Sequence, residues 1–150
     1  MAILGLDHVN VVVSDMERSL AFYRDLLGLV VAMDRRLDGP WYERLTGTVG
    51  VRARCVILDR RDGGCRIELL AFEDDEGRPL PLNSRHTTPG LRHLALRVDT
   101  IDDLAARLGV QVVEVPHDIV RGGKRMCYAQ DPDGAVIELC QYGSERPEFC

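Results

Sequence analysis

One pattern occurs twice in this chain of 150 residues and limits what the chain can fold into. Residues 6–13, LDHVNVVV, return as residues 91–98, LRHLALRV. From His8 in the first copy and His93 in the second, apolar residues alternate with other residues, as in a strand with one apolar face. A pattern repeated at this distance indicates two copies of one structural module.

Each of these strands leads into a predicted helix that starts at a capping-box-like pair and ends before a glycine. The pairs and glycines are Ser14 with Glu17 before Gly28, and Thr100 with Asp103 before Gly109. Apolar residues recur at helical spacing between them. Both copies therefore open with a strand, a helix and a glycine.

Both copies also close alike. Residues 63–69, GGCRIEL, parallel residues 133–139, DGAVIEL, so a glycine turn feeds a strand that carries one carboxylate, Glu68 or Glu138. Further strands are predicted at 29–35 and 51–58 in the first copy, and at 111–115 and 124–129 in the second. Each copy therefore reads βαβββ, and the predicted fold class is α+β.

We expect a single domain over 1–150, with a first module at about 1–73, a linker at 74–90, a second module at about 91–142 and a tail at 143–150. The linker is rich in charge and proline. A module of about 70 residues with one helix has a marginal core, so packing of the two modules together is the natural remedy. The first module is the longer one, and its extra residues at 38–50 are a candidate pocket wall.

Composition excludes several classes of function. The net charge of −5 and pI near 5.3 argue against a general surface for nucleic acid or anionic membranes. Five cysteines form no CxxC pair, so neither a disulfide scaffold nor a zinc knuckle is predicted. No apolar run approaches the roughly 18 residues of a membrane span, and no leader pattern precedes the first strand. A cytoplasmic location is expected.

Strand parity predicts a metal site. His8, Glu68, His93 and Glu138 all lie opposite the apolar positions of their strands, and they would converge if the two sheets curl around a common axis. Two carboxylates brought together repel each other, and a divalent cation offsets that repulsion. Two nitrogen and two oxygen ligands suit Zn²⁺, Ni²⁺, Co²⁺, Fe²⁺ or Mn²⁺. One strand histidine alone is usually structural, but all four positions obey both the parity and the repeat.

These motifs resemble the glyoxalase, bleomycin-resistance and extradiol-dioxygenase superfamily, also called vicinal oxygen chelate proteins, over nearly the whole chain. The segments that carry the resemblance are 6–9, 19–28, 67–69, 90–95 and 131–139. The resemblance implies paired βαβββ modules that form a cupped, barrel-like mixed sheet with helices outside. It also implies a homodimer and a metal that chelates neighbouring oxygens of a substrate.

Within that superfamily, the set of two histidines and two glutamates resembles glyoxalase I and methylmalonyl-CoA epimerase. This implies a lyase or isomerase in which the metal stabilises an enediolate while a carboxylate, Glu138 or Glu68, removes the adjacent proton. Bacterial members that use glutathione carry an arginine after the first ligand and an asparagine after the second. Residues 9–13 contain no arginine and residues 69–72 contain no asparagine, so glutathione recognition is not predicted.

Two alternatives stay open. An extradiol-type dioxygenase, or another metal-dependent enzyme of the superfamily, would use two histidines and one glutamate and leave the position of Glu68 without a ligand role. A drug-sequestering protein of the bleomycin-resistance kind would bind its ligand without a metal and would not require four ligands.

The expected partner is a small-molecule substrate, with no nucleic acid and no membrane. Four residues are predicted to contact the substrate: Arg66, Arg97, Trp41 and Tyr142. The two arginines share the strand parity of the metal ligands and could bind an anionic group, with a salt bridge at the end of the sheet as the alternative. Trp41 lies in the insertion at 38–50, and Tyr142 follows Glu138 on the same strand face.

Overall fold

The computed structural model describes residues 2–61, 63–73, 89–113, 116–120 and 123–143. The chain divides into two compact units, Met1–Pro79 and Leu80–Cys150. These units contain the two predicted modules, and each is described by itself. Most of the predicted linker and tail lies outside the described residues.

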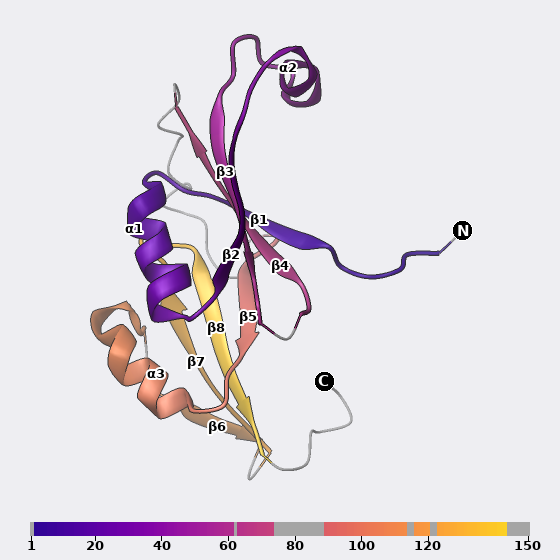
Figure 1. The fold of residues 1–150 in the computed structure, drawn as a ribbon. Helices are drawn as coiled ribbons and strands as arrows, with labels where there is room; N and C mark the ends of the chain where they lie inside the picture. Colours follow the sequence, from indigo (N-terminus) through magenta and orange to yellow (C-terminus); the bar gives the residue numbers. More distant parts are fainter. Residues whose placement is uncertain (1, 62, 74–88, 114–115, 121–122, 144–150) are drawn as a thin grey trace. The chain divides into compact units, whose positions relative to one another are not determined.

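The first module is an open, mixed sheet of four strands with a helical segment that contacts β4 (Figure 1). Its elements are β1 (His8–Val12), α1 (Met16–Leu20), a π-helical continuation (Ala21–Leu26), β2 (Val30–Leu37), α2 (Pro40–Thr46), β3 (Ala53–Asp59) and β4 (Arg66–Phe72). The strand order is β1-β4-β3-β2, with β1 parallel to β4 and the other neighbours antiparallel.

The second module repeats this arrangement. Its elements are β5 (His93–Arg97), α3 (Ile101–Leu108), a 3₁₀ turn (Gly109–Gln111), β6 (His117–Val120), β7 (Lys124–Gln130) and β8 (Val136–Tyr142). The order is β5-β8-β7-β6, again with only the first pair parallel. The predicted α+β class and the two βαβββ modules are confirmed. Among the described residues, no helix is long and apolar enough to cross a membrane.

The predicted alternation of strand faces is present in both modules. Along β1 and along β5, exposed and half-buried residues alternate, and His8 and His93 fall on the exposed side. The half-buried residues belong to the face that packs toward the helix, where Leu69 of β4 is fully buried. Each histidine therefore lies on the face that the helix leaves uncovered.

The insertion of the first module builds a second apolar cluster. No element was predicted at 38–50, the candidate pocket wall, but Pro40 opens the helix α2, as proline often does at a first helical position. The helix places Tyr42, which is 3% exposed, against buried residues of β2 and β3. One of them, Ile57, lies directly opposite Glu68 in the ladder. Directly opposed residues share a sheet face, so this cluster borders the predicted ligand.

Two local predictions were wrong. The cap of α1 is Asp15 rather than Ser14, because its carboxylate accepts the backbone N–H of Arg18 at 3.0 Å. The second strand of the second module, β6, begins at His117, a predicted loop residue, rather than at Gln111. Of the predicted strand at 111–115, Gln111 ends the 3₁₀ turn after α3, Val112 forms an isolated bridge with Ala129, and 114–115 lie outside the described residues.

The cysteines are expected to differ sharply in reactivity. Those in the described residues are free thiols, and Cys65 is exposed whereas Cys127 is buried. Burial raises the pKa of the Cys127 thiol, so little thiolate is present at pH 8. Iodoacetamide should modify Cys65 in the native protein and Cys127 only after denaturation, as followed by peptide mass spectrometry. Equal labelling of both in native protein would contradict the buried position of Cys127.

Candidate metal centre

The first histidine and glutamate meet across two parallel strands. Asn10 of β1 lies opposite Glu68 of β4, which brings the His8 side chain, two residues earlier on the same face, close to the carboxylate. Nε2 of His8 is 3.5 Å from Oε2 of Glu68. Nδ1 of His8 is 2.8 Å from Oδ1 of Asp7. A proton on Nδ1 leaves the lone pair of Nε2 available, which is the form in which histidine binds a metal.

Neutral groups hold Glu68. The Asn10 amide donates to Oε2 at 2.9 Å, and the Cys55 thiol donates to Oε1 at 3.4 Å. Burial and then this hydrogen bond raise the pKa of the Cys55 thiol to about 12, so it remains a donor at neutral pH. The carboxylate is thereby oriented without a cation of the described residues in contact with it.

The second pair has the same register and a different setting. Nε2 of His93 is 3.3 Å from Oε2 of Glu138, which is buried at 7% exposure. Oε1 of Glu138 accepts a hydrogen bond from Nζ of Lys124 at 3.0 Å. This bond raises the pKa of Lys124, so the side chain stays a cation. The His93 ring also lies 5.7 Å, centroid to centroid, from the ring of Tyr128.

The geometry of each pair fits two ligands of one ion. Ligands that lie about 2.0–2.2 Å from a zinc-like ion at ordinary coordination angles are about 3.0–3.5 Å apart. The two Nε2–Oε2 distances fall at that separation. Within the described residues, no three histidine, cysteine or acidic side chains gather at one place. Each module therefore places two candidate donors together, fewer than the four that a zinc-like ion usually binds.

The predicted substrate residues lie in different surroundings. Arg66 forms an ion pair with Asp7, and the hydrogen bonds of Asp7 with His8 and Arg66 hold the pKa of Asp7 below its ordinary value. Arg97 instead lies over the ring of Tyr142, with Cζ 5.5 Å from the ring centroid. Trp41 is half exposed on α2 and contacts Tyr42.

Sequence reasoning missed the residues that hold the two glutamates. Asn10 could have been found from strand parity, since it shares the face of His8. Cys55 and Lys124 come from strands whose register the sequence did not specify, so no pattern linked them to Glu68 or Glu138.

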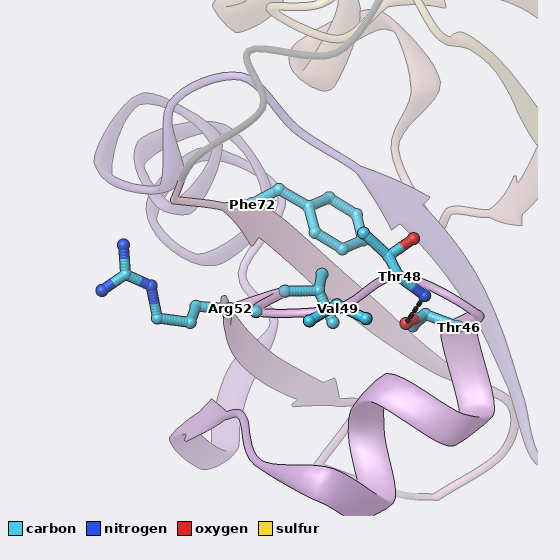
Figure 2. Close-up of a pocket in the computed structure, with 7 residues that line it drawn as sticks. Thr46, Thr48, Val49, Arg52 and Phe72 are labelled. Atoms are coloured by element: carbon cyan, nitrogen blue, oxygen red, sulfur yellow. Dashed lines mark hydrogen bonds between the residues drawn. The ribbon is translucent and has the colours of Figure 1, made fainter.

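An open cavity lies beside the insertion of the first module. It has a volume of about 550 Å³ and is lined mostly by the chain between α2 and β3, together with Phe72 at the end of β4. Figure 2 shows the Phe72 ring directed toward Thr48, whose backbone N–H donates to Oγ1 of Thr46 at 3.3 Å. Neither His8 nor Glu68 lines it, so the cavity is separate from the ligand pair.

A buried aspartate shapes the turn that leads to Glu138. Asp131 is 4% exposed and accepts the backbone N–H groups of Asp133 at 3.0 Å and Ala135 at 2.7 Å. Asp131→Ala should lower the free energy of unfolding by about 2–3 kcal/mol, because both donors lose their acceptor. Urea denaturation measures this, with the exposed helix residue Asp103→Ala as a control expected within about 0.5 kcal/mol of wild type. A loss below that level for Asp131→Ala would contradict the structural role.

Comparison with known proteins gives a consistent picture. The profile of the Glyoxalase/Bleomycin resistance protein/Dioxygenase superfamily matches residues 5–139. The uncharacterized protein YaeR of Escherichia coli is 31% identical over 88% of this chain and 92% of its own. A probable lactoylglutathione lyase of Synechocystis is 28% identical, over 93% of this chain and 96% of its own.

Solved structures share the fold. A glyoxalase family protein from Bacillus cereus superposes with a TM-score of 0.86 at 23% identity, covering 96% of this chain and 97% of that one, which shows the fold alone. TnmS3, an antibiotic binding protein from Streptomyces, has a TM-score of 0.62 at 27% identity, covering 95% of this chain and 99% of its own.

Proposed function

Because the chain belongs to the glyoxalase, bleomycin resistance protein and dioxygenase superfamily, we propose that it is a divalent-metal-dependent lyase or isomerase that moves a proton beside a carbonyl group. One observation carries the proposal: each module sets a histidine Nε2 against a glutamate Oε2 at the separation of two metal ligands. The similarity to a probable lactoylglutathione lyase supports it further.

The proposed ligands are His8, Glu68, His93 and Glu138, around one Zn²⁺, Ni²⁺, Co²⁺, Fe²⁺ or Mn²⁺ ion. When bound, such an ion polarises a substrate carbonyl and stabilises the negative charge that develops on its oxygen. The protein contributes orientation, since Asp7 fixes the ring of His8 and Lys124 fixes Glu138.

A carboxylate accepts the proton from the carbon beside the carbonyl and returns it to the substrate. We assign this step to Glu68, with Glu138 as the other candidate. Glu68 is held by an amide and a thiol, whereas Glu138 is held by the ammonium group of Lys124. Hydrogen bonds from charged donors are about twice as strong as neutral ones, so Glu68 leaves its position at lower cost.

Two other functions make different demands. An extradiol-type dioxygenase would need no ligand at Glu68, yet Asn10 and Cys55 orient that carboxylate toward His8. A metal-free binder is favoured by the similarity to the antibiotic binding protein TnmS3 and by the open cavity at Phe72. Retention of metal separates this binder from the enzyme.

Hydrogen exchange in deuterium oxide tests the reaction. Protein loaded in turn with Zn²⁺, Ni²⁺ and Mn²⁺ is incubated with hemithioacetals, 2-oxo acids and acyl thioesters, and proton NMR follows the carbon beside each carbonyl. We expect metal-dependent deuterium incorporation into one substrate class. Absence of exchange for every substrate class, together with saturable binding of one of these compounds to metal-free protein, would favour the metal-free binder. We also propose a homodimer, which light scattering would detect as twice the 16.8 kDa chain mass.

A further inference from the structure

The two modules carry opposite chemistry at equivalent positions. Four residues after the histidine stands Val12 in the first module and Arg97 in the second, and four residues after the glutamate stand Phe72 and Tyr142. The ladder partner of Phe72 is Ala53, and that of Tyr142 is Lys124. An apolar trio in the first module thus corresponds to a trio of two cations and a phenol in the second.

The second trio is gathered around one ring. Cζ of Arg97 lies 5.5 Å and Nζ of Lys124 lies 5.7 Å from the centroid of the Tyr142 ring. Cations attracted to an aromatic face in this way are held in place without being neutralised. Lys124 is also sheltered, since only 18% of its side chain is exposed.

Arg97 differs from most arginines of the described strands, as does Arg35 of β2, because no carboxylate of the described residues pairs with it. Arg54 pairs with Asp34 and Glu17, and Arg125 pairs with Asp102 and Asp118. Within the described part of the chain, Arg97 has no carboxylate partner. Within the trio, Glu138 compensates the charge of Lys124 but not that of Arg97. The trio therefore keeps one uncompensated positive charge.

We propose that Arg97, Lys124 and Tyr142 form a binding site for an oxyanion group, a carboxylate or a phosphate, of the substrate. A guanidinium group stacked on a ring keeps its N–H edge free to bind two oxygens at once. This inference rests on the proposed function only in naming its substrate class. The site itself lies within the second module, and no metal takes part in it.

Anion binding to metal-free protein tests the site apart from catalysis. Isothermal titration calorimetry with inorganic phosphate and with succinate is run on wild type, Arg97→Gln and Arg36→Gln. Arg36 lies on β2 and pairs with Glu73, so its substitution removes the same charge from the first module. We expect Arg97→Gln to weaken binding about tenfold or more and Arg36→Gln to leave it unchanged.

A second variant tests Glu138, the carboxylate that both Lys124 and His93 contact. Glu138→Gln removes the charge that compensates Lys124, so it should tighten anion binding several-fold even though it removes a proposed metal ligand. Backbone amide NMR spectra check that each variant is folded and show whether signals of β5, β7 and β8 shift with the anion.

The outcomes are separable. If Arg97→Gln weakens the binding of both phosphate and succinate, the site binds oxyanions in general. If it weakens the binding of only one, that anion is the preferred group. Wild-type dissociation constants above about 50 mM for both, or equal weakening by the two arginine variants, would overturn the site. Failure of anion binding in a protein that retains metal after loading would leave the proposed function standing. Anion binding by a protein that retains no metal after loading would leave the anion site standing and overturn the proposed function.

Discussion

Replacing His93 by alanine is expected to reduce the bound divalent metal from near one ion per chain to under about a tenth of an ion. The imidazole of His93 is one of only two nitrogen donors in the proposed set, and its Nε2 lies 3.3 Å from the partner Glu138. Loss of one of four ligands leaves an open coordination position that water fills with a much weaker bond. Elemental analysis of protein purified without chelator, then dialysed, measures the ratio.

His8→Ala should give the same loss, because His8 occupies the equivalent position of the first module. His117, which lies on β6 and has no counterpart in the repeat, provides the control: His117→Ala should keep the wild-type metal content. Metal that remains in both His8→Ala and His93→Ala would refute a site shared by the two modules. No metal in wild type after loading would favour the metal-free binder instead.

The sequence was most informative where one rule governed a whole strand. Alternation along β1 and β5 placed His8 and His93 on the face opposite the helix, since a side-chain period of two leaves no other arrangement. The repeat then predicted that each module carries one histidine strand and one glutamate strand. Both inferences depend on patterns that can be read along the chain without knowledge of strand register.

Side-chain contacts between neighbouring strands could not be predicted from the sequence. β7 pairs with β8 in a register that places Lys124 opposite Tyr142, four residues beyond Glu138. From that position the Lys124 side chain reaches the Glu138 carboxylate. No local pattern specifies that register. The same holds for Cys55, whose bond to Glu68 depends on the β3–β4 register.

Local competition explains the smaller differences. Asp15 and Ser14 are both good caps, and the choice between them depends on where the strand ends. In the second module, Thr100 makes no side-chain cap, and Gln141 of β8 accepts the backbone N–H of Ile101 at 2.9 Å in its place. A tertiary contact thus replaces the local one that the sequence predicted.

The two glutamates should respond differently to substitution by glutamine. In metal-saturated protein, Glu68→Gln is expected to slow proton exchange by about 10²–10⁴-fold, the usual contribution of a positioned base, with a smaller loss of metal. Glu138→Gln should chiefly weaken metal retention, because this buried carboxylate is fixed by Lys124 and faces His93 through Oε2.

Deuterium exchange and elemental analysis on the same samples distinguish the two effects. Glu43→Gln is the control, since Glu43 lies on α2 and accepts the backbone N–H of Gly50 away from both ligand pairs. If Glu138→Gln keeps its metal but loses exchange while Glu68→Gln keeps exchange, the roles are reversed and Glu138 is the base. The strength of the hydrogen bonds to each carboxylate would then not decide which glutamate acts as the base. Each turnover would also require Glu138 to separate from Lys124.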